Sequence, residues 1–275
     1  MSKIKLAVCQ MRVGNDKQQN LKRAGEMIEN AVNNGAEMVV LPEVFNAPYQ
    51  AELFPDYAEA FPGPSTDFLS QKALKHNICL VGGSVIERDD SGRLYNTSFV
   101  FDSAGKLMGR HRKMHLFDVN ISGGINFQES ATLSAGDQLS ILSFKEFPFA
   151  VMICFDIRFP ELARMASLKG AKLLVVPAAF NSTTGPLHWE LLMRTRAVDN
   201  QVYLAAASPA LNPKAVYQAW GHSLIIDPWG NIIAQAGNKE EIIMAKLDTA
   251  IVDKVRQELP VLKQRRTDIY NIAWR

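Results

Sequence analysis

The stretch Gly35–Phe45, which reads GAEMVVLPEVF, has a close counterpart later in the chain at Gly170–Phe180, which reads GAKLLVVPAAF. Each copy contains a short apolar run followed by proline, a pattern typical of a buried strand that ends in a loop. A second pair repeats in the same order, since Ser98–Gly105 (SFVFDSAG) is similar to Ser223–Gly230 (SLIIDPWG). The two pairs predict a chain made of two similar halves.

The segments around the first copy read as strand, helix and strand. Lys5–Gln10 is an apolar strand, and Asn20–Asn33 has apolar residues at the spacing of an amphipathic helix. Gly35 stands where a helix-terminating glycine belongs, and Glu37–Pro42 forms the next strand. This order is the signature of an α/β protein.

The rest of the chain continues this alternation, without a linker rich in glycine, serine or proline between the halves. The further expected helices are Ser65–His76 and Pro160–Lys169, and the further expected strands lie near Ile78–Ile86, Tyr95–Asp102, Lys106–Gly109, Phe149–Cys154 and Lys172–Pro177, with a hairpin turn at Asp89–Gly92. We therefore expect one domain over residues 1–275, in which each half is a sheet covered by helices and the sheets pack against each other.

Composition excludes several classes of protein. The 275 residues are 47% hydrophobic and carry 30 basic against 28 acidic side chains, which excludes a disordered chain and provides no field to attract nucleic acid or an anionic membrane. The longest apolar run, Phe147–Phe155, is too short to span a bilayer, and the first residues lack a secretory signal. Three cysteines are too few for a disulfide framework. We expect a soluble cytoplasmic protein with reduced thiols and with no nucleic-acid or membrane partner.

Cys154 stands where an apolar strand meets a turn and a helix that begins near Pro160. Active sites of α/β proteins gather at the carboxyl ends of strands. Backbone N–H groups and a nearby helix N-terminus are expected to lower the pKa of this thiol toward neutrality, which favours a nucleophile. Cys9 and Cys79 lie inside strand patterns and are interpreted as packing residues.

Two further chemical groups follow strands in the same way. Glu43 directly follows the apolar run and proline of the first half, and Ala178 occupies the matching position in the second half. This contrast indicates that folding needs no acid there, so Glu43 is a functional candidate. Lys113 follows the strand near Lys106–Gly109, although the basic run Arg110–Lys113 is also typical of a solvated patch.

Histidines offer competing interpretations. His111 and His115 are spaced like half a metal site, but no further Cys/His cluster with ligand spacing occurs, so we expect no metal. A Cys–His pair, with Cys154 activated by His188 or His222, is a mechanism that sequence spacing leaves open. Neither GxGxxG nor GxxxxGK[ST] occurs, so no phosphate-binding loop is predicted.

Together these motifs resemble the nitrilase superfamily of carbon–nitrogen hydrolases along essentially the whole chain. The resemblance rests on LPEVFNAPY around Glu43, HRKMHLFD around Lys113, GINFQES around Glu129 and ICFDIRFPELAR around Cys154. The stretches AFNSTTGPLHWELLMRTRAVDNQVY, WGHSLIIDPWG and LKQRRTDIY are most similar to the omega-amidase branch, although neighbouring branches also carry a version of the HWE segment. One position departs from that branch, because Phe155 stands where tyrosine is frequent.

The resemblance implies a four-layer αββα sandwich of two similar halves and a Glu–Lys–Cys triad. Carried over to this sequence, Cys154 is the nucleophile, Glu43 the general base and Lys113 the oxyanion-stabilising cation, which favours lysine over histidine as the third member. Glu129 matches a second acid used for positioning. The resemblance also implies a small-molecule amide substrate, no metal or organic cofactor, and a homo-oligomer, either a dimer or larger.

These residue types suit amide hydrolysis. Glu43 takes the thiol proton and returns it to the departing amine, which is otherwise a poor leaving group. Lys113 and the backbone N–H of Phe155 stabilise the tetrahedral oxyanion, and one such donor is typically worth about 3–4 kcal/mol of barrier. A thioester remains on Cys154 until a water molecule activated by Glu43 releases the acid.

Fewer residues indicate the substrate than indicate the reaction. Arg158 lies shortly after the nucleophile, where its guanidinium either binds a substrate carboxylate or forms a surface ion pair with Asp156 or Glu161. Phe180 and Thr184 follow the strand of the second half that matches the strand before the general base, so they are candidates for the pocket wall, although an aromatic and a hydroxyl residue at a strand end are also typical of a core side chain and a helix cap. A carboxylate-binding Arg158 predicts a short amide with an acid at its other end, such as alpha-ketoglutaramate, in agreement with the omega-amidase resemblance.

Two other functions stay open on the sequence alone. A sister hydrolase of the superfamily acts on deaminated glutathione or an N-carbamoyl compound, and a comparison of kcat/KM across these substrates separates it from an omega-amidase. A catalytically silent module keeps the sandwich for contacts with partner proteins. In such a module Cys154 reacts no faster than an ordinary thiol.

Overall fold

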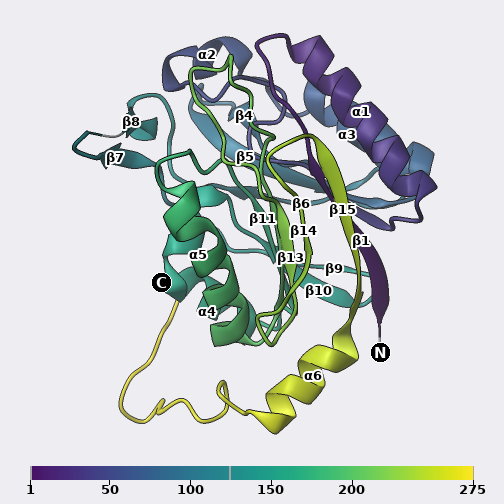
Figure 1. The fold of residues 1–275 in the computed structure, drawn as a ribbon, viewed down its shortest axis with the longest axis vertical. Helices are drawn as coiled ribbons and strands as arrows, with labels where there is room; N and C mark the ends of the chain where they lie inside the picture. Colours follow the sequence, from purple (N-terminus) through teal and green to yellow (C-terminus); the bar gives the residue numbers. More distant parts are fainter. Residues whose placement is uncertain (1, 124, 275) are drawn as a thin grey trace.

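The computed structural model describes residues 2–123 and 125–274. Figure 1 shows four layers, in which α1 (Lys17–Asn33) and α3 (Pro64–His76) cover one sheet and α4 (Pro160–Leu168) and α5 (Gly185–Asn200) cover the other. The two sheets pack against each other between these helices, so the predicted αββα sandwich is confirmed. Gly124, the first residue of the GINFQES motif, lies outside the described residues.

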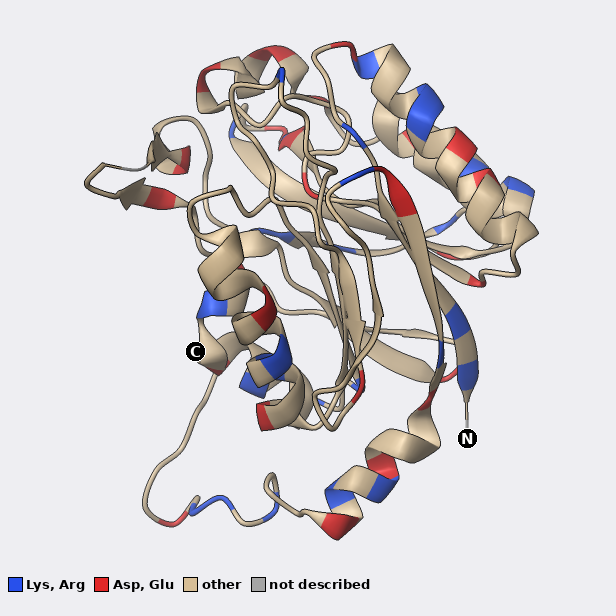
Figure 2. Ribbon diagram, in the orientation of Figure 1, with Lys and Arg blue, Asp and Glu red and all other residues tan. Residues whose placement is uncertain are grey.

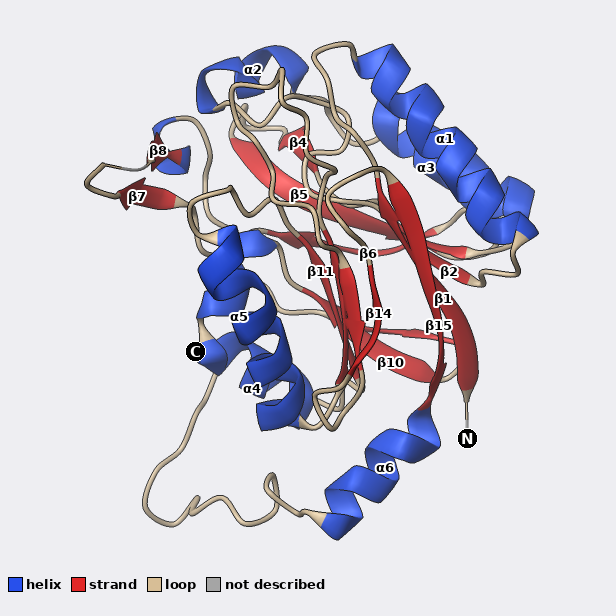
Figure 3. Ribbon diagram, viewed as in Figure 1, coloured by secondary structure: helices blue, strands red, loops and turns tan. Residues whose placement is uncertain are grey.

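The strands are red in Figure 3, and both halves of the chain contribute them. Those of the first half are β1 (Lys3–Gln10), β2 (Met38–Val40), β3 (Cys79–Val81), β4 (Val85–Arg88), β5 (Leu94–Phe101), β6 (Leu107–Arg112), β7 (Asp118–Asn120) and β8 (Asn126–Gln128). Those of the second half are β9 (Ile141–Phe144), β10 (Phe147–Val151), β11 (Leu173–Pro177), β12 (Tyr203–Ala207), β13 (Leu224–Ile226), β14 (Ile232–Gln235) and β15 (Glu241–Asp248). The remaining elements are α2 (Phe54–Tyr57), α6 (Thr249–Glu258) and 3-10 turns at Ala51–Leu53, Glu129–Ala131 and Cys154–Arg158.

The two sheets follow the same plan. Within residues 2–123 and 125–274, the first sheet has seven strands in the order β15-β1-β2-β3-β5-β4, with β6 also paired to β5, and the second has six in the order β14-β13-β12-β11-β10-β9. In the first sheet β1, β2 and β3 run parallel between antiparallel β15 and β5. In the second sheet β10, β11 and β12 run parallel between antiparallel β9 and β13. This matched order confirms the two similar halves.

The second repeated stretch forms the same turn in both halves. After β5 the Asp102 side chain accepts two backbone N–H groups, two and four residues further on, each at 2.9 Å. After β13 the Asp227 side chain accepts the equivalent pair, also at 2.9 Å. Gly105 and Gly230 take φ values of +72° and +83° in these turns, a region that favours glycine.

Apolar side chains fill the space between the sheets and the space beneath the helices. Leu6 and Val8 of β1 belong to the cluster between the sheets, together with Phe149 and Val151 of β10. Ala7, on the opposite face of β1, belongs to the cluster beneath α1 and α3, and a matching cluster lies beneath α4 and α5. The central strands therefore have two buried faces, which explains why they read as continuous apolar runs without alternation.

Two predicted strands differ from the observed elements. The strand before the nucleophile ends at Val151 rather than Cys154, because Cys154 takes a φ of +48° that cannot continue a strand. The region expected as strand near Ile78–Ile86 is interrupted between β3 and β4, where Gly83 has a φ of +51°. The other expected elements are present, with ends shifted by a few residues.

The last strand of the chain, β15, completes the first sheet. It is absent from the elements expected from the sequence, and it pairs antiparallel with β1 along its whole length. After α6 the chain continues as turns and coil (Figure 1). Figure 2 shows that residues of both charges are interspersed on the helices and loops. No helix in the described part of the chain is long and apolar enough to cross a membrane.

Candidate active site

Three buried groups from three strand ends meet in the interior. Glu43 follows β2, Lys113 follows β6 and Cys154 follows β10, and each is at most 4% exposed. The Lys113 ammonium nitrogen lies 2.9 Å from Glu43 Oε1. The charges of Glu43 and Lys113 both act on the pKa of Cys154. The structure therefore brings together the three residues that the sequence singled out.

The loop that carries Glu43 is held in an uncommon backbone conformation. Val44 has a φ of +46°, which is strained for a β-branched residue, and its N–H donates to Ser84 Oγ at 2.9 Å. A Cβ atom on Gly83 would lie 2.0 Å from the Pro42 oxygen, so only glycine fits beside this loop. The close packing of these two loops fixes the position of the Glu43 backbone.

Lys113 is held by its backbone and by its ammonium group. Its N–H donates to the Asn96 carbonyl at 2.8 Å, and its Nζ lies 2.8 Å from Glu129 Oε2. Burial lowers the pKa of Lys113, but the charges of Glu129 and Glu43 outweigh burial and hold this pKa well above its ordinary value. Lys113 therefore stays protonated and acts as a cation rather than as a base.

Glu43 combines a raised pKa with one free oxygen. Burial raises the pKa of Glu43, the Lys113 charge lowers it, and the Glu129 charge raises it again, so that it lies above its ordinary value. Oε1 of Glu43 accepts a hydrogen bond from Lys113, whereas Oε2 is buried and has no partner among the described residues. A carboxylate of this kind can accept a proton from a neighbouring thiol.

The Cys154 thiol has a raised pKa. Burial is the largest cause, the Glu43 charge adds to it, and the Lys113 charge opposes it without reversing it. The lowered pKa expected from the sequence is therefore wrong, because the thiol is enclosed by both halves of the sandwich and stands beside a carboxylate. Such a thiol needs a base to become a nucleophilic thiolate.

Two polar residues that were not predicted from the sequence contact the carboxylates. Asn96 Nδ2 donates to Glu43 Oε1 at 2.9 Å and to Glu129 Oε1 at 3.1 Å. The Tyr49 hydroxyl donates to Glu43 Oε1 at 3.3 Å. Tyr49 belongs to the LPEVFNAPY motif, and Asn96 is a polar residue inside the expected strand Tyr95–Asp102. A polar side chain in a buried strand is the signal that points to Asn96, because such groups need partners.

Asp156 connects the turn of the nucleophile with the loop of Lys113. Its buried carboxylate accepts the Ile153 N–H at 3.0 Å and contacts ring nitrogens of His111 and His115 at 2.8 Å each. Burial raises the pKa of Asp156, but these bonds outweigh burial and bring the pKa well below its ordinary range. Within the described residues, no group of three His, Cys, Asp or Glu side chains is placed to hold a metal ion.

The two histidines considered as bases have other partners. His188 Nδ1 lies 3.2 Å from a guanidinium nitrogen of Arg158, and His222 Nδ1 lies 2.8 Å from a backbone carbonyl oxygen. A carboxylate and an ammonium group, rather than an imidazole, are the charges that act on the pKa of Cys154. This arrangement favours the Glu–Lys–Cys combination over the Cys–His pair.

Arg158 lies half-buried among aromatic rings. Its guanidinium carbon is 4.9 Å from the ring centre of Phe180 and 5.6 Å from that of Phe155, and burial lowers its pKa. Within residues 2–123 and 125–274, no carboxylate forms an ion pair with Arg158. The alternative interpretation of Arg158 as the partner of Asp156 or Glu161 is therefore wrong.

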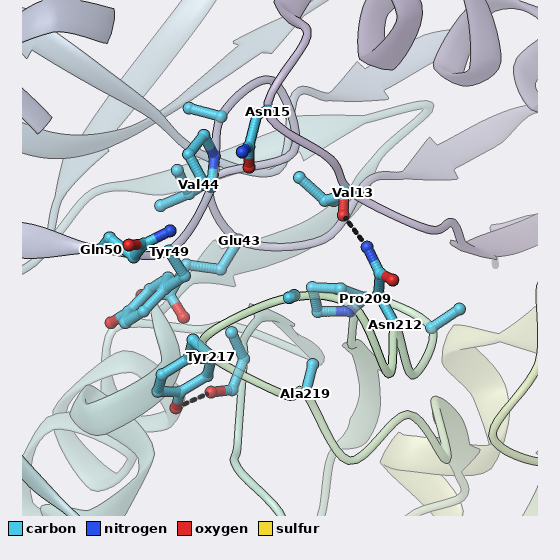
Figure 4. A pocket seen from close by; sticks show the side chains of 15 residues that line it. Val13, Asn15, Glu43, Val44, Tyr49, Gln50, Pro209, Asn212, Tyr217 and Ala219 are labelled. Atoms are coloured by element: carbon cyan, nitrogen blue, oxygen red, sulfur yellow. Dashed lines mark hydrogen bonds between the residues drawn. The ribbon is translucent and has the colours of Figure 1, made fainter. Parts of the chain in front are cut away.

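A small cavity of about 40 Å³, part of it open to solvent, reaches Glu43 (Figure 4). The lining comes from four loops, those after β1, β2, β11 and β12, and consists of Val13, Asn15, Glu43, Val44, Ala47, Pro48, Tyr49, Gln50, Ala179, Pro209, Ala210, Asn212, Ala215, Tyr217 and Ala219. Of these described residues Glu43 alone carries a formal charge. Phe155, Arg158, Phe180 and Thr184 do not line this cavity. Thr184 is buried at the start of α5, where its N–H donates to Asn181 Oδ1 at 2.9 Å.

Comparisons with known proteins agree with this fold. The sequence model of the carbon–nitrogen hydrolase family matches residues 5–257. The chain is 52% identical to Omega-amidase NIT2 of Xenopus tropicalis and 48% identical to Omega-amidase NIT2 of Homo sapiens, each over 272 residues, 99% of this chain and 98% of the relative. The crystal structure of Saccharomyces cerevisiae Nit3, a member of branch 10 of the nitrilase superfamily, matches with a TM-score of 0.89 and 46% identity over 96% of this chain and 97% of that chain. With nearly the whole chain matched in sequence and in fold, this protein belongs to the carbon–nitrogen hydrolase family.

Proposed function

We propose that this protein is an omega-amidase, which hydrolyses the terminal amide of a small dicarboxylic acid monoamide of the alpha-ketoglutaramate type to an acid and ammonia. The buried contact between Glu43, Lys113 and Cys154 carries the proposal, because it supplies a base, a cation and a nucleophile. The relatives named omega-amidase, 52% and 48% identical over nearly the full length, support the substrate class.

In the first half-reaction Glu43 takes the thiol proton through its free Oε2, and Cys154 Sγ forms a bond to the amide carbon. Negative charge moves to the amide oxygen, where the Lys113 ammonium and the N–H of Phe155 stabilise it. Glu43 then gives the proton to the amide nitrogen, the carbon–nitrogen bond breaks, and ammonia leaves. A thioester remains on Cys154.

In the second half-reaction water attacks the thioester while Glu43 accepts one of its protons. The tetrahedral intermediate collapses, the carbon–sulfur bond breaks, and the proton returns from Glu43 to Sγ of Cys154 as the acid is released. The cavity at Glu43 supports this step, because it gives water and ammonia a route to the same carboxylate. The raised pKa of Cys154 means that the proton stays on sulfur between cycles.

Glu129 and Asp156 serve in this proposal as positioning residues. Glu129 Oε2 lies 2.8 Å from Lys113 Nζ and accepts the Phe117 N–H at 2.7 Å, so it holds the ammonium in place. Asp156 joins the backbone before Cys154 to the two histidines that flank Lys113. Together they fix the separation between the nucleophile and the cation.

Arg158 supports a substrate with an acid at its far end. A half-buried guanidinium without a carboxylate partner among the described residues is suited to bidentate binding of a substrate carboxylate. The rings of Phe155 and Phe180 flank it and shield it from water, which strengthens such a contact. We propose Thr184 as a further residue of this region, because it directly precedes α5, the helix whose His188 contacts Arg158.

Arg158→Gln is expected to lower kcat/KM for alpha-ketoglutaramate about 30- to 150-fold, which corresponds to about 2–3 kcal/mol for a lost charge-assisted contact. Turnover of an amide of the same length without the acid should change less than about threefold, because that substrate never uses the guanidinium. Ammonia release measured with both substrates gives the two ratios.

Arg93→Gln is the matched control, because Arg93 is an exposed arginine of the turn before β5 that contacts Asp89 and Ser91. It should leave both ratios unchanged. An equal loss on both substrates would show that Arg158 supports the fold rather than the substrate. Deaminated glutathione and an N-carbamoyl compound belong in the same assay, and a higher kcat/KM on either would replace the omega-amidase proposal by that of a sister hydrolase.

We also propose a homo-oligomer, a dimer or larger, that forms through α5. Leu187, Leu191 and Val198 are 71%, 64% and 47% exposed, and their spacing places them on one side of the helix. Sedimentation should give at least twice the chain mass of 30.6 kDa. Leu191→Glu should reduce the sedimenting mass to that of one chain, and a native protein that already sediments as one chain would contradict the proposal.

A single domain over residues 1–275, located in the cytoplasm, completes the proposal. The cluster between the sheets takes side chains from both halves, for example Val8 and Val175, so the two halves share one core. The three cysteines are free thiols, which suits a reducing compartment.

A further inference from the structure

The two oxygens of the Glu43 carboxylate have different surroundings. Oε1 accepts three hydrogen bonds, from Lys113 Nζ at 2.9 Å, from Asn96 Nδ2 at 2.9 Å and from the Tyr49 hydroxyl at 3.3 Å. Oε2 is also buried, yet it accepts none from the described residues. A buried carboxylate oxygen without a donor is costly, and the thiol of Cys154 is the neighbouring group that interacts with this carboxylate. Oε2 is therefore the oxygen left open to the thiol proton.

Asn96 is the neutral donor in this arrangement, and its side chain is fixed by the sheet. It lies on β5 opposite Ile86 of β4 and is fully buried. Its backbone carbonyl accepts the Lys113 N–H at 2.8 Å. Its Nδ2 must face the carboxylates of Glu43 and Glu129, because both are acceptors and its own carbonyl oxygen would repel them.

We propose that Asn96 is a positioning residue that occupies Oε1 of Glu43 and thereby directs proton transfer to Oε2. The inference rests on the proposed role of Glu43 as general base. Asn96 contacts no reacting atom and acts through the carboxylate. Lys113 alone leaves the rotation of that carboxylate undecided, because an ammonium is a point charge with freely rotating donors. The planar amide, held by β5, selects one oxygen.

Asn96 also stabilises two adjacent carboxylates without adding charge, because its amide donates a hydrogen bond to each of them. Glu43 and Glu129 share one ammonium, that of Lys113, so the three groups carry a net negative charge in a buried site. Removing the Asn96 donor disfavours the ionised form of Glu43 and raises its pKa. The titratable groups that face Glu43 from the surrounding segments all remain in such a variant, and they are Lys113, Glu129, Cys154, Tyr49 and Tyr217.

Asn96→Ala is therefore expected to lower kcat about 10- to 100-fold with less than about a threefold change in KM, because Asn96 contacts the base and not the substrate. The acidic limb of kcat/KM should move to higher pH by about one unit, since this limb reports the ionisation of the base in the free enzyme. Iodoacetamide alkylation of Cys154 should show the same shift, and that measurement needs no amide substrate.

Asn200→Ala is the matched control, because Asn200 is equally buried but its amide donates to the Arg196 carbonyl in α5. It should leave the acidic limb in place. If Asn96→Ala does not fold, Asn96→Ser carries the same test, since a serine hydroxyl is too short to replace the amide donor. Thermal unfolding of each variant establishes that it is folded.

An Asn96→Ala protein that loses activity equally at every pH, or that keeps native activity, would overturn this inference. A different result would contradict the proposed function: a Glu43→Gln protein that keeps native turnover. If Glu43→Gln is inactive but the acidic limb of kcat/KM does not move in Asn96→Ala, the proposed function stands and only the positioning role of Asn96 is contradicted.

Discussion

Replacing Cys154 with alanine is expected to lower kcat for ammonia release at least about 10⁴-fold. The change removes the atom that forms the thioester, and an amide carbonyl is too poor an electrophile for a Glu43-activated water to replace the sulfur efficiently. Steady-state ammonia release from alpha-ketoglutaramate, measured on a variant whose thermal unfolding matches the native protein, gives the ratio. Turnover close to native in a folded Cys154→Ala protein would exclude the thioester mechanism.

Cys79→Ala is the matched control for this experiment. Cys79 is a free thiol at the start of β3, fully buried, with its sulfur 4.0 Å from that of Met108. Burial raises its pKa, as it does for Cys154, so the two thiols differ in their neighbours rather than in their exposure. The Cys79 variant should keep its activity. If neither the native protein nor this variant releases ammonia from any short amide, a silent binding module replaces the enzyme proposal.

Glu43→Gln is expected to lower kcat about 10³-fold, because the amide cannot take the proton from Cys154 or return it to the leaving nitrogen. The native pKa of Glu43 lies above its ordinary value, so native activity is present above that pKa and is lost as the pH falls through it. Glutamine does not titrate, and the acidic limb of the pH–rate profile should disappear. A variant that keeps more than about a tenth of native kcat would remove Glu43 from the role of base.

The same substitution should leave the protein as stable as before or make it more stable. A carboxyl group whose pKa is raised in the folded state contributes stability at low pH, and this contribution is lost as pH rises through the raised pKa. Ionised Glu43 therefore lowers the free energy of unfolding at neutral pH. When its charge is removed, Lys113 still has Glu129 as its ion-pair partner. The thermal midpoint at pH 7 checks this expectation.

Glu129→Gln retains the general base Glu43, so it should lower kcat less than Glu43→Gln does.

Much of the architecture can be predicted from the sequence, because the patterns that indicate it involve residues close together in the chain. The apolar runs of Gly35–Phe45 and Gly170–Phe180 are buried on both faces, and a strand in that position needs apolar residues throughout. The aspartate turns after β5 and β13 depend on side-chain bonds that span four residues. The pairing of β15 with β1 has no such local signal, since it joins opposite ends of the chain and β15 has mixed burial.

The candidate site can be predicted only in part from the sequence, because only some of its residues have a local signal. Glu43, Lys113 and Cys154 each follow a strand, and the carboxyl ends of strands are where α/β proteins gather reactive groups. The resemblance to a known superfamily supplied their roles. Asn96 and Tyr49 do not directly follow the end of a strand. Asn96 is marked in the sequence only as a polar residue inside an expected strand, and the contacts of both residues with the Glu43 carboxylate are seen only in the folded structure.

The residue types of the site and the two-half sandwich that holds them follow from the order of amino acids, because strands, turns and buried faces depend on near neighbours. The protonation of those residues follows from the folded structure. Cys154 has a raised rather than a lowered pKa because packed sheets exclude water from it and place Glu43 beside it. Arg158 has no carboxylate partner among the described residues because Asp156 is bound by histidines instead. Burial and charge contacts join residues far apart in the chain, and only the folded molecule sets those distances.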